Sequence, residues 1–383
     1  MLNNPDGDSV MIQSKPRCEV GAAMTRVSRL LIGILLFFSI LTFNAQAQEV
    51  KRLGLNTTIR NVGEEIKSIQ ELGVSLIRMP LEWQLIKIRP GEYDWTVIDR
   101  LVKAAQTRQV EVLLTIRSRW ETEKEKTQKY KAKKGSIQIT PINPPSVNKE
   151  QWIHFVETLA NRYRGQGVNY EIGNEVNEET SWRGTLEEYL ELLTLGYDVI
   201  KKADPQAKVL PSAMGCGILR NYKSGLVRQE AWKWHDSWLQ PILSTKKFDV
   251  VNVHNYYFPS DIVANGLIFR TYLEHIQELM RRSGVGDRPI WITEIGYVSS
   301  PTETGGRIET GSLIETGGRM DNGSPEKQAQ WLTEAYQQAF ELGVERIYWH
   351  LLRDRKEPYF GSMGLADAKI SPRPAWNALK QFK

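Results

Sequence analysis

Short β-rich segments alternate with amphipathic helical patterns along most of the chain, and the alternation occurs eight times. The β-rich segments lie at 52–58, 75–83, 111–120, 168–176, 208–214, 248–257, 289–298 and 346–354. The helical patterns that follow them lie at 63–73, 95–109, 148–165, 185–203, 230–243, 266–284, 324–343 and 374–382. A helix after each strand returns the chain for another parallel strand. Eight such units predict an α/β fold, the (β/α)8 TIM barrel, with a doubly wound open sheet as the alternative.

The length of the chain suits one such domain. Its 383 residues, 41% of them hydrophobic, can bury a full core, and these barrels run from about 250 residues to more than 400 with insertions. We therefore expect a single catalytic domain at 48–383. Residues 303–319 repeat an E-T-G unit after the seventh predicted strand, which predicts a low-complexity loop at the C-terminal face of the barrel.

The N-terminal extension, residues 1–47, has the pattern of a signal peptide. Two arginines precede a mostly apolar run at 30–43, and small residues follow it up to Ala47. The run is shorter than the roughly 20 residues that cross a bilayer. We expect a start at Met24, cleavage near Ala47 and a secreted or periplasmic protein, with an uncleaved membrane anchor as the alternative.

Composition argues against several classes of partner. The 50 basic and 45 acidic residues are spread along the chain, so no basic arm indicates binding to nucleic acid. The five histidines show no ligand spacing, and no glycine-rich nucleotide loop is present. The sequence therefore predicts no metal and no cofactor.

Two glutamates end the fourth and seventh predicted strands. Glu175 lies in "YEIGNEV" and Glu294 in "WITEIGY". In a barrel these strand ends meet at one opening, on the face where this fold carries its active sites. Paired carboxylates there suit glycoside hydrolysis, in which one acid protonates the leaving oxygen and the other attacks or stabilises the anomeric carbon.

Several motifs resemble those of the clan A glycoside hydrolases, which are retaining (β/α)8 enzymes. "EIGNEVN" and "WITEIGY" are similar to the motifs of strands four and seven, and "IRMPLEW", "VHNYY" and "IYWH" to segments of strands two, six and eight. Gly173 and Val176 depart from the pattern, since an aromatic residue and a proline are frequent there. The third strand has Arg117, Arg119 and Trp120 where family 5 commonly has a histidine. This favours family 39, with the family 5 cellulases as second choice.

The resemblance implies that Glu175 is the acid/base and Glu294 the nucleophile. The nucleophile has to stay ionised, which requires nearby donors and positive charge. Arg78, Asn174 and Tyr256 are candidates to supply them, and Asn174 would also bond the sugar 2-hydroxyl. His254 shares a strand face with Tyr256, which would place it near the leaving group.

Aromatic residues after the strands are candidates for stacking on sugar rings. Trp349 is the first of them, followed by Trp83 and Trp120, and ordinary core packing is the alternative for each. The remaining glutamates of the fourth segment, Glu171, Glu178 and Glu179, are expected to be surface charges or partners of Arg183.

These patterns favour a secreted retaining hydrolase that cleaves a β-linked polysaccharide or oligosaccharide by double displacement. One alternative is a catalytically inactive barrel that binds glycans, and another is an inverting hydrolase with more widely spaced carboxylates. Stable membrane association is not expected if the signal is cleaved, while the sugar and the oligomeric state stay open. An anionic glycan is a further hypothesis, and ion pairing is its alternative. It rests on five arginines after strands: Arg117, Arg119, Arg183, Arg353 and Arg355.

Overall fold

The computed structural model describes residues 53–57, 62–117, 148–178, 181–215, 225–257, 268–299, 323–355 and 362–382. These residues lie within one compact unit, Val50–Lys383. Eight strands form a parallel sheet in the order β7-β6-β5-β2-β1-β10-β9-β8. Their bounds are β1 Leu53–Asn56, β2 Leu76–Glu82, β5 Glu111–Arg117, β6 Val168–Ile172, β7 Val209–Pro211, β8 Val251–Tyr257, β9 Ile290–Tyr297 and β10 Val344–Trp349.

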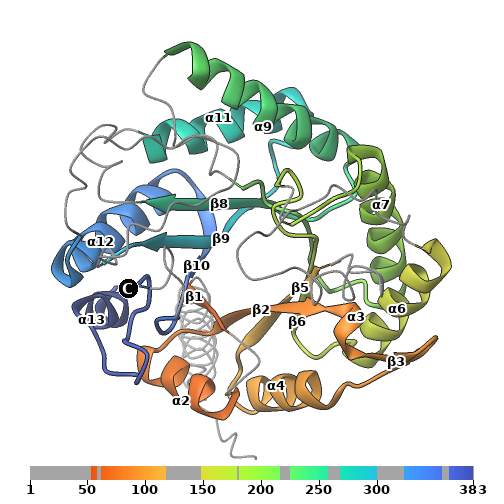
Figure 1. Ribbon diagram of the computed structural model, residues 1–383, viewed down its shortest axis with the longest axis horizontal. Helices are drawn as coiled ribbons and strands as arrows, with labels where there is room; N and C mark the ends of the chain where they lie inside the picture. Colours follow the sequence, from red (N-terminus) through yellow and green to blue (C-terminus); the bar gives the residue numbers. More distant parts are fainter. Residues whose placement is uncertain are drawn as a thin grey trace, which may run out of the picture. The chain divides into compact units, whose positions relative to one another are not determined.

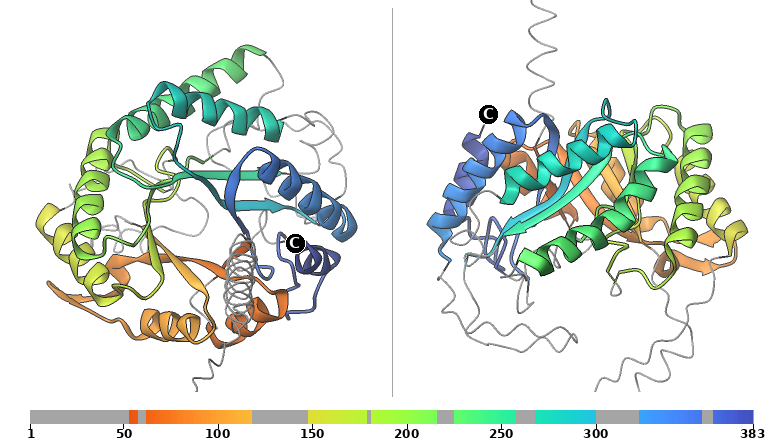
Figure 2. Two further views of the ribbon diagram at one scale, coloured as in Figure 1. Left: turned by 180° about the vertical axis from the view of Figure 1, so that it is seen from behind. Right: turned by 90° about the horizontal axis from the view of Figure 1, so that it is seen from above.

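Helices surround these strands in an outer ring (Figure 1). Figure 2 shows the same ring from behind and from above. The helices are α2 Val62–Leu72, α4 Thr96–Gln106, α6 Lys149–Arg162, α7 Leu186–Ala203, α9 Gly225–Thr245, α11 Ile268–Arg282, α12 Pro325–Glu341 and α13 Pro374–Gln381. Each follows a strand of the sheet, which confirms the predicted (β/α)8 barrel.

The two end strands of this order, β7 and β8, meet largely through side chains. Asp249 Oδ2 accepts a hydrogen bond from Val209 N at 2.9 Å, and Asp249 N donates to Val209 O at 2.7 Å. Asn252 Nδ2 donates to Pro211 O at 3.2 Å. These contacts close the barrel where the described strands lack a continuous ladder.

Successive strand residues alternate between the barrel interior and the layer beneath the helices. On β2, Ile77 and Met79 belong to the large outer core, whereas Leu76 belongs to a separate interior cluster and Arg78 follows it on the same face. The interior cluster consists of Leu76, Leu113, Leu210, Val250, Trp291 and Tyr348. The apolar floor of the barrel therefore lies below the inward-facing polar residues.

Helix α7 shows how local sequence fixes these elements. Its N-cap Thr185 accepts a hydrogen bond from Glu188 N, and the Glu188 carboxylate accepts one from Thr185 N, which forms a capping box. Lys201 and Lys202 lie in the last turn, where positive charge complements the helix dipole. The helix thus begins directly after the loop that carries the fourth-strand glutamates.

A short insertion that the sequence pattern did not predict lies between β2 and α4. It consists of α3 Trp83–Ile86 and a two-stranded hairpin, β3 Lys87–Arg89 and β4 Glu92–Tyr93. Leu85 and Ile88 in this insertion are exposed, whereas Trp83 at its start is buried.

Several predicted features lie outside the described residues: the N-terminal extension at 1–47, the loop at 303–319, and Trp120. Their roles stay predictions. Within the part of the chain that the structure describes, no helix combines the length and the apolar character needed to cross a membrane.

Candidate active site

Arg78 on β2 is the centre of a buried polar network inside the barrel. Its Nε and Nη2 donate to the two carboxylate oxygens of Glu171 at 2.7 and 3.0 Å, which is a bidentate pair. Its Nη1 donates to Asn56 Oδ1 at 2.9 Å and also to Glu294 Oε1. Burial alone would lower the pKa of Arg78, but the charges of Glu171 and Glu294 raise it above its usual value. The guanidinium is therefore a permanent cation.

Glu294 on β9 is held as an anion. Its Oε1 accepts from Arg78 and its Oε2 accepts from the Tyr256 hydroxyl. Burial alone would raise its pKa, but the neighbouring His254 and Arg78 and the hydrogen bond from Tyr256 hold the pKa well below the usual range. Glu294 is thus the ionised carboxylate that the chemistry of a nucleophile requires.

Glu175 lies in a different environment from Glu294. Its side chain is 24% exposed, and its Oε1 lies 3.0 Å from His254 Nδ1. The other ring nitrogen of His254 lies 3.0 Å from Thr293 Oγ1, so the buried imidazole is fixed between two strands. One carboxylate is ion-paired and buried, and the other is reachable from solvent.

The backbone after β6 turns sharply to present Glu175. Gly173 has φ 86°, and a Cβ there would come within 3.0 Å of both Tyr189 and Val176. Glycine is the residue that fits this conformation and this space, which explains the absence of an aromatic residue. Glu175 itself has φ 48°, a conformation that non-glycine residues rarely adopt and that recurs at functional sites.

Two anchors hold this turn against the neighbouring loop. The Tyr189 hydroxyl donates to Ile172 O at 2.8 Å and accepts from Ser212 N at 2.7 Å. Asn177 exchanges two hydrogen bonds with the backbone of Gly215, at 2.7 and 3.0 Å. The turn is therefore tied on both sides of Glu175.

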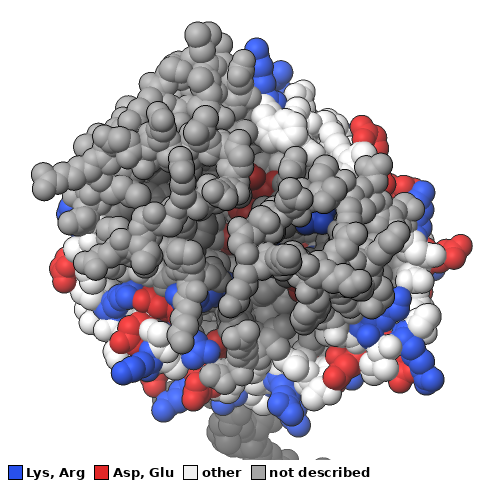
Figure 3. Space-filling model, viewed as in Figure 1, with Lys and Arg blue, Asp and Glu red and all other residues white. Residues whose placement is uncertain are grey.

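The two catalytic candidates approach each other closely. A carboxylate oxygen of Glu175, a ring nitrogen of His254 and a carboxylate oxygen of Glu294 all lie within 4.8 Å of one another. Figure 3 shows acidic atoms near the centre of the face in view, with charges of both signs around its perimeter.

The orientation of Asn174 follows from its partner. Arg78 Nη2 lies 2.7 Å from Asn174 Oδ1. Because a guanidinium can only donate, the atom facing it has to be the oxygen, and the amide NH2 points elsewhere. Two donors of Asn174 are therefore left for other groups at the mouth of the barrel.

The two described tryptophans that were candidates for sugar stacking do not offer open ring faces. Trp349 is fully buried in the outer core, and its indole nitrogen donates to Met363 O at 2.9 Å. Trp83 is 4% exposed and stacks on Phe155 with ring centroids 5.3 Å apart. Both positions match the core-packing alternative, not the stacking one, because each side chain lies on the strand face or turn that the helices cover.

Glu171 is a functional candidate that was expected to be a surface charge or a partner of Arg183, and the structure pairs it with Arg78 instead. It is fully buried. Besides Arg78, it accepts hydrogen bonds from Thr115 Oγ1 at 2.6 Å and Asn252 Nδ2 at 2.7 Å. Its role is to position Arg78. A signal existed: Glu171 alternates with buried Tyr170 and Ile172, so on a strand covered on both sides it faces the interior.

His350, directly after β10, is a second residue whose role was missed. Its Nδ1 is buried without a hydrogen-bond partner among the described residues and lies 3.9 Å from Glu294 Oε2. Its ring meets that of Tyr256 edge-on, with centroids 5.5 Å apart. Burial lowers the pKa of His350 to about 4, so it is a neutral imidazole at neutral pH. A buried polar atom without a partner beside Glu294 makes His350 a candidate for contact with a ligand.

Replacing His350 by alanine is expected to raise KM for a good substrate by about tenfold, the equivalent of one hydrogen bond, with a smaller change in kcat. His350→Gln should recover part of the loss, because glutamine keeps a polar group there. Steady-state kinetics of both variants test this. An unchanged KM in His350→Ala would remove His350 from the substrate site.

Two of the arginines considered for an anionic substrate already have carboxylate neighbours. Arg117 Nη1 lies 3.8 Å from Glu82 Oε1, and Arg353 Nη2 lies 3.4 Å from Glu65 Oε1. These contacts favour the ion-pairing alternative for both residues.

Comparisons with solved structures match this fold. A family 39 glycoside hydrolase from Bacteroides cellulosilyticus WH2 superposes with a TM-score of 0.57 at 17% identity, over 87% of this chain and 64% of that one. An endo-β-1,4-mannanase from Thermotoga petrophila gives 0.56 at 14% identity, over 87% and 76%. The cellulose synthase subunit Z of Clostridioides difficile gives 0.52 at 13% identity, over 86% and 99%. These likenesses concern the fold, and this chain spans less than two thirds of the family 39 structure.

Sequence comparison narrows the choice between the two families considered above. A search of curated proteins found no match. The family model for cellulase, glycosyl hydrolase family 5, matches residues 43–352, which is most of the chain and includes both strand-end glutamates. The chain therefore belongs to the cellulase family, glycosyl hydrolase family 5.

Proposed function

We propose that the protein is a retaining glycoside hydrolase that cleaves β-linked glycans by double displacement. The observation that carries this proposal is the pair Glu175 and Glu294, whose closest carboxylate oxygens lie within 4.8 Å. Retaining enzymes place their carboxyl groups about 5–5.5 Å apart, whereas inverting enzymes need about 6.5–9.5 Å to admit a water. The short separation supports retention.

In the first step Glu175 gives its proton to the leaving oxygen while Glu294 attacks the anomeric carbon. Glu175 suits the acid role because its side chain reaches solvent and substrate. Arg78 and Tyr256 orient the two oxygens of Glu294. The free amide of Asn174 donates to the 2-hydroxyl, a contact that strengthens in the transition state.

In the second step Glu175, now a carboxylate, removes a proton from the water that attacks the glycosyl-enzyme. His254 Nδ1, at 3.0 Å, steadies Glu175 in this form. When the bond between Glu294 and the anomeric carbon breaks, Glu294 becomes a carboxylate again. Arg78 and Tyr256 then stabilise its negative charge. The two carboxylates thus exchange charge during the cycle while the surrounding donors stay in place.

Activity on a panel of aryl β-glycosides, followed by NMR of the first-formed anomer, tests the proposal. The expected result is hydrolysis of at least one glycoside with retention. Inverted product would indicate the single-displacement mechanism. Binding of glycans without turnover on the whole panel would favour the inactive barrel. The same panel, extended to anionic glycans, identifies the sugar and tests for a preference for charged substrates. Analysis of the mature N-terminus tests export by a signal peptide.

The hydroxyl of Tyr256 should affect chemistry and its pH dependence. Removing this donor in Tyr256→Phe raises the pKa of Glu294, because one stabiliser of the anion is lost. We expect kcat to fall by about tenfold to a hundredfold and the acidic limb of kcat/KM to move to higher pH. In the unmodified enzyme that limb should lie below about 4.3, the ordinary value for glutamate.

Tyr297→Phe is the matched control, since Tyr297 lies on the same strand as Glu294 but packs against Trp331. A pH profile recorded for all three proteins separates the outcomes. If the acidic limb of Tyr256→Phe coincided with that of the control, Tyr256 would not be holding the nucleophile in its ionised form.

A further inference from the structure

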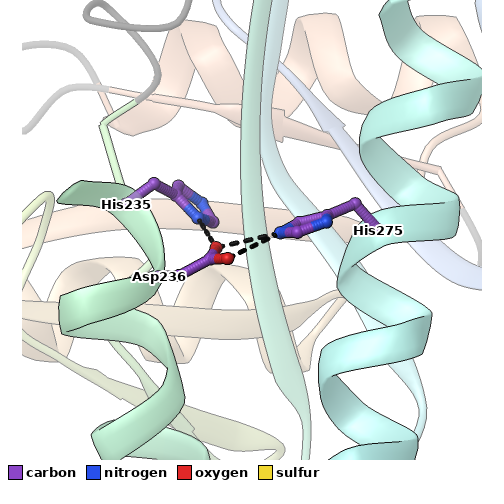
Figure 4. A group of neighbouring side chains, drawn as sticks. All are labelled: His235, Asp236 and His275. Carbon is purple, nitrogen blue, oxygen red and sulfur yellow. Dashed lines mark hydrogen bonds and ion pairs between the residues drawn. The ribbon is translucent and has the colours of Figure 1, made fainter. Parts of the chain in front are cut away.

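A second group of ligand-type side chains lies in the outer helical layer, away from the catalytic residues on the strands. His235 and Asp236 lie on α9, and His275 lies on the neighbouring helix α11. Figure 4 shows the three side chains pointing toward one another between these helices. His235 Nδ1 lies 3.0 Å from Asp236 Oδ1, and His275 Nε2 lies 2.9 Å from the same oxygen and 3.1 Å from Oδ2.

The donor set and its spacing suit a transition metal. One atom from each residue lies within 4.8 Å of the other two. Two ligands at about 2.0–2.1 Å from a tetrahedral Zn²⁺ are about 3.3 Å apart, so the two histidine–aspartate separations need to open by only a few tenths of an ångström. Two imidazoles and a carboxylate favour Zn²⁺ and related divalent ions over Mg²⁺ or Ca²⁺. We propose that His235, Asp236 and His275 bind one divalent transition-metal ion, with Zn²⁺ as the expected occupant, which clips α9 to α11.

The surroundings of His235 supply a second, independent observation. Its Nε2 lies 3.2 Å from the Tyr272 hydroxyl, one turn before His275 on α11. Metal-bound histidines usually donate their other N–H to such a partner, which fixes the tautomer and the ring orientation. With a metal on Nδ1, His235 donates from Nε2 to Tyr272. Without one, Nδ1–H donates to Asp236 and the tyrosine hydroxyl donates to Nε2.

Access from solvent is also compatible with metal binding. The side chains of Asp236 and His275 are 24% and 29% exposed, so an ion can reach the group from solvent. Asp236 also lines a surface depression with Lys233.

The sequence could not reveal this group, because the two histidines are separated by β8 and stand on different helices. Without a metal, the three side chains form a hydrogen-bonded link between two helices. That role and metal binding predict different absorption spectra in the presence of Co²⁺.

The test uses the full chain without an affinity tag, freed of metal by a chelator. Titration with Co²⁺ should produce visible absorption bands that saturate at one ion per chain. Zn²⁺ should raise the melting temperature progressively with free metal, since binding to the native state stabilises it. His275→Ala should lose both responses. His154→Ala should keep both, because this exposed histidine lies on α6, outside the group.

Two further variants keep the proposal falsifiable. Tyr272→Phe should weaken metal affinity by about tenfold to a hundredfold. If His275→Ala does not fold, His275→Cys replaces it, and a thiolate-to-Co²⁺ band at shorter wavelength would mark direct coordination. No visible bands in the unmodified protein, or unchanged bands in His275→Ala, would overturn the proposal and leave a hydrogen-bonded link. Aryl glycosidase activity is expected to persist after chelation.

Discussion

Replacing Glu294 by glutamine is expected to lower kcat/KM on an activated aryl glycoside by roughly 10⁴-fold or more, the order found when a catalytic nucleophile is removed. The amide has nearly the same shape and keeps an oxygen for Arg78 or Tyr256, but it cannot form the covalent intermediate. Circular dichroism should remain that of the folded enzyme. Activity within tenfold of the unmodified enzyme would exclude Glu294 as the nucleophile.

Azide then separates the roles of the two glutamates. In Glu175→Ala a small anion can enter the space of the lost carboxylate and attack the glycosyl-enzyme, so activity should return with a glycosyl azide of retained configuration. Glu178→Ala, which removes a carboxylate from the same loop, is the control and should neither lose activity nor respond to azide. An inverted azide from Glu175→Ala would exchange the two assignments.

Arg78→Met is expected to destabilise the protein by about 3–5 kcal/mol, the cost of removing one partner from a buried ion pair. Glu171 is completely buried and depends on Arg78 for two of its hydrogen bonds. Without the guanidinium it has to remain a buried anion or take up a proton. Catalysis should fall as well, because Glu294 and Asn174 lose the same donor.

Urea unfolding of Arg78→Met and Arg270→Met measures the difference. Arg270 also pairs with a glutamate, Glu341, at 3.3 Å, but both side chains are exposed, at 40% and 66%. Exposed pairs contribute only about 0–1 kcal/mol, so the control should lose far less. The double change Arg78→Met with Glu171→Met should recover stability, since no buried charge then stands alone. Equal losses of unfolding free energy in the two single variants would show that the buried polar network does not depend on Arg78.

The fold was predictable because strand and helix patterns alternate with clear boundaries. The patterns did not determine which residues of each strand face the barrel interior. Strands covered on both sides are mostly apolar, so hydrophobic patterning shows the inward face only where a polar residue such as Glu171 marks it. The resemblance of "IYWH" to an eighth-strand motif made Trp349 a stacking candidate, whereas the structure buries it against the helices and brings His350 to Glu294.

The predicted site and the structural one differ for the same reason. Glu175, Glu294, Arg78, Tyr256 and His254 come together because their strand ends meet, and topology alone predicts that. The role of Glu171 depends on an inward-facing arginine two strands away in the sheet, 93 residues distant in sequence. Such pairings follow from register, which hydrophobic patterning does not determine.

The seam between β7 and β8 bears on how the barrel fluctuates. Elements joined by few backbone hydrogen bonds open at a lower free energy than the rest of a domain, so amide hydrogen exchange should find its weakest point in the sheet here. Asn252, which bridges this seam, also donates to Glu171, and Glu171 holds Arg78. Opening of the seam therefore disturbs Arg78, which anchors Glu294, before the remaining strands separate. On heating, activity should be lost at a lower temperature than global secondary structure.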